Sequence, residues 1–366
     1  MIPYETIDYR NNLPFSANFI NVLDEPVHCH KELEILLLLR GFCRYKIYHS
    51  EYNLQPGDMI IADVEDLHRI HDASLDVLML QVHLDTKKFE QVYPNISATY
   101  FVCEDPGYHA GDDAALGSNQ RVLRHQLAKL MLDTSGSPND FVLQTDNINE
   151  VLSTLVRHFR GFYMEDYQYR IGRTDVSETD LDRMSRITSY LLANHEKKVT
   201  LEEVAATLHL NPYYVSHLIK KTLGIPFQRF LNGIRLEFAE KNLLFSTMSL
   251  TQVSEYSGFS SLNYFNKCFH DWYGFTPSHY RKTIPQGKRQ AGASFQLREA
   301  LDLTGKYLSP VVAVKKMVMA PAFFPREVRI TKESSSAGNE PPRPRILLKT
   351  QEDLVGLGFL KDRATA

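Results

Sequence analysis

The sequence has little cysteine and no long apolar run. Its four cysteines, among 366 residues, are scattered without paired spacing, which indicates reduced thiols in a cytosol. No run of 18 apolar residues occurs, so we expect no membrane span. Residues 1–5 lack the basic and apolar pattern of a secretory leader, and we therefore expect a cytoplasmic protein. A length of 366 residues predicts two or three domains.

The residues Ser257–Phe269 have the pattern of a tight turn that leads into a helix. Gly258 suits a backbone with positive φ, and Ser260 or Ser261 can cap the N–H groups of the following helix. Two phenylalanines four residues apart bury one face, which leaves amide and ammonium groups on the outside. Taken alone, the pattern also fits an ordinary amphipathic helix.

A second pair of helices lies upstream. Thr200 and Glu203 have capping-box spacing at the start of its first helix, and Asn211 followed by Pro212 starts its second. Gly224 can end this second helix. Helix, short turn and helix are typical of DNA-binding pairs.

Residues 227–245 have apolar side chains at helical spacing and predict a helix that joins the two pairs. About 18 residues give roughly 27 Å of helix, against about 34 Å between successive major grooves on one DNA face. A rigid connector of this length could hold two reading helices one DNA turn apart.

With these motifs, residues 180–285 resemble the DNA-binding domain of the AraC/XylS family of bacterial transcription regulators. The matching residues are Leu201, Ala205, Gly224, Phe230-Leu231, Arg235-Leu236, Ala239, Leu243-Leu244, Gly258-Phe259, Tyr264-Phe265, Phe269, Gly274, Thr276-Pro277 and Tyr280-Arg281. Four positions depart from the pattern. His209 replaces a turn glycine, which would destabilise the fold by about 1 kcal/mol if its φ is positive. Ser254 and Ser257 replace small apolar residues, and His270 replaces a lysine.

The resemblance implies double-stranded promoter DNA and RNA polymerase as partners, a homodimer, and activation more often than repression. The side chains that we expect at the DNA are Tyr213, Ser216, His217, Lys220, Lys221, Ser261, Asn263, Asn266, Lys267 and Arg281. Charge is distributed unevenly: residues 1–199 hold 19 basic and 30 acidic side chains, while residues 200–285 have a net charge of +2 and residues 286–366 of +6. Because +2 is small for a DNA binder, the local placement of the cations must provide the attraction.

The front of the chain reads as strands separated by turns. Leu33–Leu39 is an apolar run interrupted by Glu34, and Arg44–Ile47, Met59–Ala62 and Leu75–Val82 also predict strands. Many short strands indicate an all-β sandwich or barrel. The fold class that we expect is therefore α+β and multidomain, with a cupin-like β-barrel, accessory helices and an all-α domain with two helix-turn-helix motifs.

His28, His30 and Glu34 have the spacing of the first motif of cupin barrels, and His68 follows a loose version of the second. The three even-numbered positions share a face if the strand is regular. We expect these residues to line the pocket of a small-molecule effector such as a sugar, with Tyr45 able to stack on it. The alternatives are a metal site in a cupin enzyme, or plain surface and core histidines. His71 and His83 read as ordinary polar residues, and we expect neither cofactor nor metal nor catalytic residue.

Two amphipathic helices are predicted at residues 121–132 and 141–160. They can pack on the barrel or hold a homodimer, and under the second interpretation Leu152→Lys and Leu155→Lys would give folded monomers. The predicted domains are a barrel (1–110), a helical dimerisation segment (111–165), a linker (166–179), the DNA-binding domain (180–285) and an unassigned, partly disordered extension (286–366). A helix at residues 294–303 is possible in the extension. No acid–base pair or nucleophile constellation supports an enzyme.

Overall fold

The computed structural model describes residues 4–9, 13–48, 50–103, 114–137, 140–161, 164–165, 168–169, 177–284 and 288–308. Residues 166–167 and 170–176 of the predicted linker lie outside these residues, whereas its last three residues cap and begin a helix at Ser177–Glu178. The part of the C-terminal extension that follows residue 308 also lies outside them, including its predicted disordered stretch.

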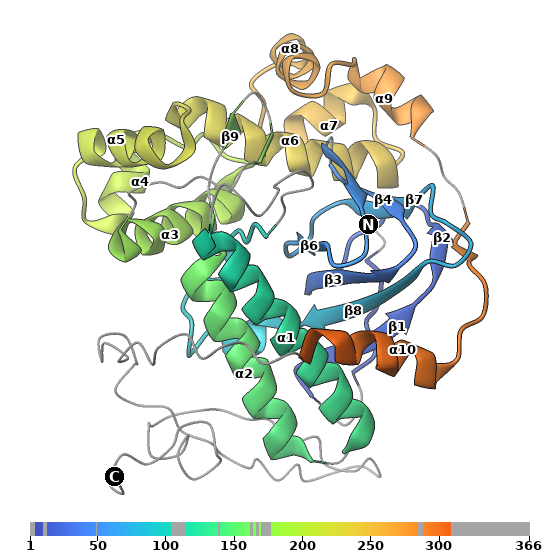
Figure 1. The fold of residues 1–366 in the computed structure, drawn as a ribbon. Coiled ribbons are helices and arrows are strands. Elements are labelled where there is room, and N and C mark those ends of the chain that lie inside the picture. The colour runs from blue at the N-terminus through green and yellow to red at the C-terminus, as the bar shows by residue number, and fades with distance from the viewer. Residues whose placement is uncertain are drawn as a thin grey trace, which may run out of the picture.

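The front of the chain folds into antiparallel sheets that face each other (Figure 1). A four-stranded sheet has the order β1 (Phe15–Ile20), β8 (Leu78–Leu84), β3 (Leu33–Arg40) and β6 (Met59–Ala62). A three-stranded sheet has the order β5 (Ser50–Leu54), β4 (Cys43–Ile47) and β7 (His68–His71). The predicted β-rich fold is confirmed, although β1, β5 and β7 were not recognised in the sequence.

Strand β3 is buried on both faces, which explains its apolar run. Ile35 and Leu37 belong to a core that also contains the helices α1 (Ala114–Gly136) and α2 (Phe141–His158). Leu36 and Leu38 belong to a second core, between the two sheets. Successive side chains of a strand point to opposite faces, so β3 separates the two cores and Glu34 lies on the inter-sheet face.

The helices α1 and α2 pack within the chain. Leu152 and Leu155 are fully buried in the core that they share with β3, at 0% exposure. The prediction that lysine at these positions gives folded monomers is therefore wrong, because each substitution would place a charge in the core. Helix α1 extends beyond the predicted range 121–132 at both ends, since it begins at Ala114 and ends at Gly136.

The second unit is helical and has a hydrophobic core of its own. Its helices are α3 (Glu178–Asn194), α4 (Leu201–Leu208), α5 (Pro212–Leu223), α6 (Phe227–Phe245), α7 (Leu250–Tyr256), α8 (Leu262–Tyr273) and α9 (Pro277–Thr283). The capping boxes at Thr200 and Ser249 are formed, and α6 joins the two helix pairs as predicted (Figure 1). His209 has φ of 55°, so the predicted cost applies: histidine in place of glycine destabilises this turn by about 1 kcal/mol.

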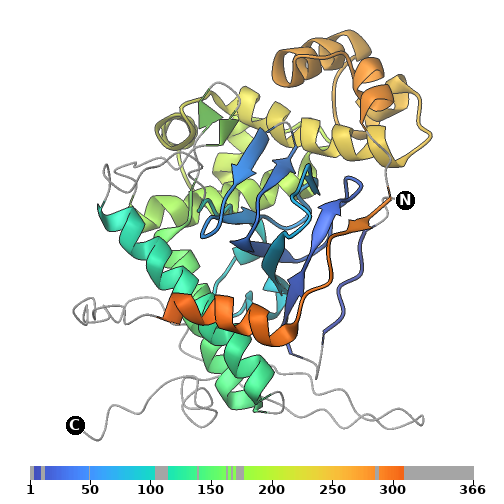
Figure 2. The ribbon, with the colours of Figure 1, turned by 45° about the vertical axis from the view of Figure 1, so that its right-hand side comes forward.

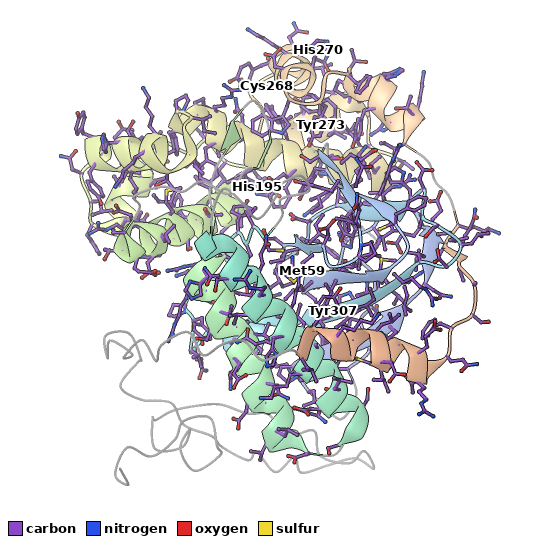
Figure 3. The ribbon with its side chains drawn as sticks, viewed as in Figure 1. Met59, His195, Cys268, His270, Tyr273 and Tyr307 are labelled. Atoms are coloured by element: carbon purple, nitrogen blue, oxygen red, sulfur yellow. The ribbon has the colours of Figure 1, made fainter. Side chains whose placement is uncertain are left out.

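After α9 the chain returns to the front sheets (Figure 2). Strand β11 (Gln290–Ala291) pairs with β2 (Val22–Asp24), and α10 (Leu297–Gly305) follows. Ala300 is fully buried in the core of β3 and α1, and Tyr307 packs against that core (Figure 3). The start of the unassigned extension is therefore part of the front unit.

The remaining described elements are short. They are the 3-10 helices η2 (Thr86–Phe89), η3 (Ile96–Ala98) and η4 (Lys306–Leu308) and the two-residue strands β9 (Met164–Glu165) and β10 (Gln168–Tyr169). Among the described residues, every helix is too short or too polar to cross a membrane.

Two glycines with positive φ allow a matched test of the second helix pair. Gly258 has φ of 81°, and an added Cβ would lie 2.1 Å from the carbonyl oxygen of His195. Gly274 has φ of 74° and nothing within 4 Å of the same position. Gly274→Ala should lower the free energy of unfolding by about 1–2 kcal/mol for the backbone conformation alone, and Gly258→Ala by about 1–3 kcal/mol more because of the overlap.

The measurement is urea unfolding followed by the fluorescence of Trp272, the single tryptophan, which packs in this unit. Equal losses for the two variants would contradict the close approach of α3 and the Gly258 turn.

Candidate nucleic-acid interface and buried histidine cluster

Helix α8 is held by its aromatic side and exposes its polar side. Phe265 and Phe269 are fully buried, at 0% exposure, in the helical core. The Tyr264 hydroxyl accepts a hydrogen bond of 2.8 Å from the Asn232 amide of α6, which fixes α8 on the connector. Asn263 and Lys267 are exposed on the opposite side, as is His270 (Figure 3).

Helix α5 is presented in the same way. Its N-terminus is capped by the Asn211 side chain, which accepts from the Tyr213 N–H at 2.8 Å. The Tyr213 side chain is 80% exposed, and His217, Lys220 and Lys221 are exposed, whereas Ser216 is half-buried. A large exposed tyrosine next to imidazole and ammonium groups is typical of a surface that contacts nucleic acid.

Several predicted DNA contacts have other partners or limited access, among them Lys221, whose Nζ lies 3.5 Å from Oδ2 of Asp180 on α3. The Ser261 hydroxyl accepts from the Tyr264 N–H at 3.2 Å as the cap of α8, and the Arg281 Nε donates to the Leu243 carbonyl at 3.0 Å. Asn266 is half-buried, and its Oδ1 is buried without a hydrogen-bond partner among the described residues. Ser261 and Arg281 therefore stabilise the helices that present the other side chains.

In the front unit, the structure brings His28, His30, Glu34 and His68 together. Their convergence does not come from a shared strand face, because β3 begins only at Leu33. His28 instead forms a bridge with His68, with reciprocal backbone hydrogen bonds of 3.1 and 3.0 Å. The assumption of a regular strand from residue 28 is therefore wrong, although the predicted residues do meet.

Glu34 lies at the centre of the group and is 2% exposed. Its Oε1 accepts from the Tyr45 hydroxyl at 2.7 Å, and its Oε2 accepts from the Gln81 amide at 2.7 Å and bonds to Nε2 of His83 at 2.9 Å. Burial alone would raise the pKa of Glu34, but the surrounding imidazoles hold it well below its ordinary value. The cluster therefore contains a buried negative charge.

His83 is the functional candidate that sequence reasoning missed. It was read as an ordinary polar residue, but in the antiparallel pairing of β3 and β8 it lies directly opposite Glu34. The signal was the alternation of β8: Leu78, Leu80 and Val82 share one face, which leaves Gln81 and His83 on the other. The sequence did not reveal that β8 lies beside β3.

Two aromatic groups are fixed within the cluster. Tyr45 is fully buried, at 0% exposure, and its ring stacks on that of His68 with 5.8 Å between centroids and 8° between planes. The face of Tyr45 that we expected to stack on a ligand therefore contacts an imidazole in this structure. Burial, followed by the neighbouring His28, lowers the pKa of His68 well below its ordinary value.

The cluster also reaches the helical unit. A cavity of about 10 Å³, the size of one water molecule, is lined by His68 and Arg69 from the front unit and by Glu240 and Tyr280 from the helices. Beside it, Nζ of Lys241 on α6 lies 3.4 Å from Oε2 of Glu65. The segment between β6 and β7 is thus in contact with both units.

Comparison with known proteins gives two matches to family models. Residues 14–145 match the AraC-like ligand binding domain, and residues 204–283 match a helix-turn-helix domain. The first range contains the histidine cluster, and the second contains α5 and α8.

The chain is also similar to named regulators. The regulatory protein PocR of Salmonella typhimurium is 36% identical over 28% of this chain and 34% of its own length. The uncharacterized HTH-type transcriptional regulator YdeC of Bacillus subtilis is 22% identical over 70% of this chain and 86% of its own length. The chain spans about a third of the length of PocR and of a staphylococcal regulator that it matches at 23% identity.

Among solved structures, the C-terminal domain of the response regulator yesN from Fusobacterium nucleatum is 32% identical. The match covers 27% of this chain and 98% of that chain, with a TM-score of 0.26.

Removal of one hydroxyl tests the buried carboxylate. Tyr45→Phe keeps the ring but removes the donor to Glu34, and water cannot replace it at a fully buried site. We expect the free energy of unfolding, measured by urea titration and far-UV circular dichroism, to fall by about 1–3 kcal/mol.

Tyr9→Phe is the control. It removes the same kind of bond, 2.8 Å to Oε1 of Glu32, from a partly buried place. We expect a smaller loss there, because water can replace the donor. A Tyr45 variant as stable as the wild type would show that Glu34 does not need this bond.

Proposed function

Because the chain belongs to the AraC/XylS family, we propose that it is a transcription regulator that binds specific promoter DNA under the control of an effector. The observation that carries this proposal is the pair of capped helices, α5 and α8, held by one connector helix. Each is anchored by buried apolar groups and exposes amide, imidazole or ammonium groups to solvent. Amides and cations are the groups that read base edges and bind phosphates.

The finer parts of the proposal come from the family. They are a small-molecule effector in the front unit, a homodimer on DNA, action as an activator through RNA polymerase, and a cytoplasmic location. Leu152 and Leu155 do not form the dimer surface, because they are buried within one chain. The enzyme alternative gains no support, because PocR and YdeC are named as regulators.

We propose that effector binding is communicated through residues 63–67. The N–H of Glu65 donates to the carbonyl of His30 at 2.9 Å, and the Glu65 side chain forms the ion pair with Lys241. The Lys241 side chain is 4% exposed, so it cannot move away from the front unit without losing a buried contact. A shift of the cluster would therefore change the packing of α6, which carries both reading helices.

The test starts with the full chain and a random DNA pool, from which bound sequences are selected. Asn263→Ala should cost about 1–3 kcal/mol and relax the preference at one base pair, because an asparagine amide forms two bonds to adenine. Asn266→Ala should have a smaller effect because Asn266 is half-buried. Loss of affinity by the same factor on all sequences would make Asn263 a backbone contact only.

Lys267→Ala separates charge from base recognition. If Lys267 binds a phosphate, its loss should weaken all sequences alike and reduce the slope of log affinity against log salt by about 1. Lys129→Ala on α1, far from the helix pairs, is the matched control and should leave the slope unchanged. If no sequence is enriched by the wild-type chain, the proposed function is wrong.

A further inference from the structure

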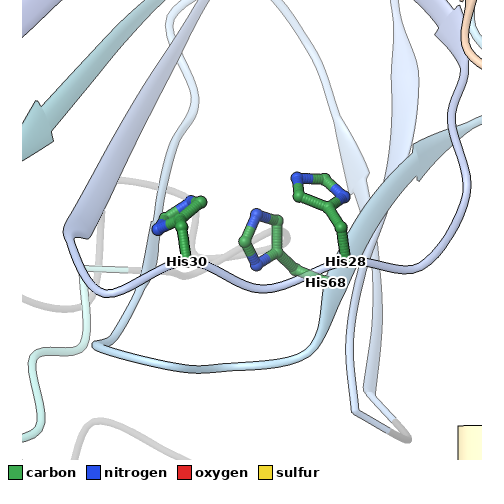
Figure 4. A group of neighbouring side chains, drawn as sticks. All are labelled: His28, His30 and His68. Atoms are coloured by element: carbon green, nitrogen blue, oxygen red, sulfur yellow. The ribbon is translucent and has the colours of Figure 1, made fainter. Parts of the chain in front are cut away.

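Three imidazoles of the front unit face one space. The ligand nitrogens of His28, His30 and His68 all lie within 4.8 Å of one another, and the three rings lie side by side in Figure 4. His28 and His68 are held by their backbone bridge, and their ring centroids are 4.3 Å apart. The backbone, and not only the side chains, fixes this arrangement.

The backbone also fixes which nitrogen of each ring carries hydrogen. Nδ1 of His28 lies 3.0 Å from the carbonyl oxygen of Pro26, and Nδ1 of His30 lies 3.1 Å from that of Glu32. Nδ1 of His68 lies 2.9 Å from the carbonyl oxygen of Asp66. A carbonyl only accepts, so each Nδ1 donates and each neutral ring has its lone pair on Nε2. Histidines that bind metals are oriented in this way.

The Nε2 atoms lack a hydrogen-bond donor. Nε2 of His30 and Nε2 of His68 are buried without a hydrogen-bond partner among the described residues. They lie 3.5 and 3.9 Å from the two carboxylate oxygens of Glu34. Lone pairs of nitrogen and oxygen thus face each other in a buried space, which is unfavourable unless a cation or a proton lies between them.

We propose that this space binds one divalent first-row transition-metal ion through Nε2 of His28, His30 and His68, with Glu34 supplying a carboxylate oxygen. Imidazole and carboxylate ligands together suit Fe²⁺, Co²⁺, Ni²⁺ or Zn²⁺. Tetrahedral ligands at roughly 2.0–2.1 Å from an ion are about 3.4 Å apart, so the nitrogens, which lie within 4.8 Å of one another, need to approach by up to about 1.4 Å. The proposal rests on the proposed function in one respect: the ion would be the effector, or part of it, that the front unit binds.

A second trio, His30, Glu34 and His83, is less suitable. Nε2 of His83 already bonds to Oε2 of Glu34 at 2.9 Å, and Gln81 bonds to the same oxygen. We therefore assign His83 and Gln81 the role of orienting the carboxylate. Oε1 has one donor, Tyr45, and is the oxygen nearer to His68.

An ion can approach from the side of His28. The side chain of His28 is 15% exposed, whereas those of His30 and His68 are each 1% exposed. Nε2 of His28 lies 3.2 Å from Oε2 of Glu5, whose side chain is 37% exposed. An acidic group at the open edge would attract a divalent cation toward the three nitrogens.

The test uses Co²⁺ alone as the probe, on the full chain after treatment with a chelator. We expect one Co²⁺ per chain by equilibrium dialysis, with visible absorption bands that Zn²⁺ abolishes by competition. His28→Ala and His68→Ala should each weaken binding by about tenfold or more, because each removes a ligand. His28 is partly exposed, so His28→Ala decides the matter if the buried His68 variant does not fold.

His71→Ala is the matched control, since His71 lies on the same strand as His68 but its ring nitrogens lie 3.5 Å from Glu51 and 3.2 Å from Asp72. It should bind Co²⁺ like the wild type. Absence of stoichiometric uptake, or equal uptake by the His28, His68 and wild-type proteins, would overturn the proposal. If no Co²⁺ is taken up and His30 shows an imidazolium resonance, a proton and not a metal ion lies between His30 and Glu34.

Selective DNA binding by the metal-free chain distinguishes the two proposals. If that binding persists while Co²⁺ is not taken up, the metal site is wrong and the regulator stands. If Co²⁺ binds but no DNA sequence is preferred, the metal site stands without the proposed function.

Discussion

The front unit depends on one buried charge, the carboxylate of Glu34. It lies on the inter-sheet face of β3, between two apolar layers, where an uncompensated ion would be strongly destabilising. The surrounding strands therefore provide donors: Tyr45 from β4, Gln81 and His83 from β8. This requirement explains why Gln81 and His83 interrupt the apolar run of β8. Glu34 is thus hydrogen-bonded to residues of both sheets, so a change at Glu34 alters contacts in both.

The same point lies next to the helical unit. His68 contacts the carboxylate on one side and lines the small cavity with Glu240 of α6 on the other. Glu240 is 1% exposed and accepts from the hydroxyls of Tyr273 and Tyr280, so its position is linked to α8 and α9. Burial raises the pKa of Glu240, and its two tyrosine donors oppose that rise. Buried polar groups thus lie in order from Glu34 through His68 and the small cavity to Glu240, Tyr273 of α8 and Tyr280 of α9. Energetic coupling among them follows only if the two units have two arrangements that the cluster favours differently.

The sequence predicted the helical unit well because its signals are local. Caps such as Thr200 and Asn211, the Pro212 start, and the positive-φ glycines act within a few residues, and the bounds of α6 agree with the predicted 227–245. The barrel was predicted in class but not in detail, because its site depends on which strands are neighbours. His83 shows the difference: its strand face could be inferred from alternation, but its position opposite Glu34 depends on the pairing of β3 with β8. The roles of Leu152 and Leu155 were open for the same reason, since an apolar helix face fits a core and an interface equally well.

The order of the chain adds a constraint that local patterns do not reveal. Residues 288–308 follow the helical unit in sequence but pack on the front unit through β11 and α10. Asn21 donates to the Ala293 carbonyl at 2.6 Å, Arg289 lies 3.7 Å from the buried Glu25, and Arg40 pairs with Glu299. The helical unit is therefore joined to the front unit at both of its ends, by residues 162–176 before α3 and 285–287 after α9. Two covalent connections reduce the freedom of a rigid unit far more than one, because rotation about a single linker is no longer available. A large swing of α5 and α8 relative to the front unit would therefore require β11 to leave β2.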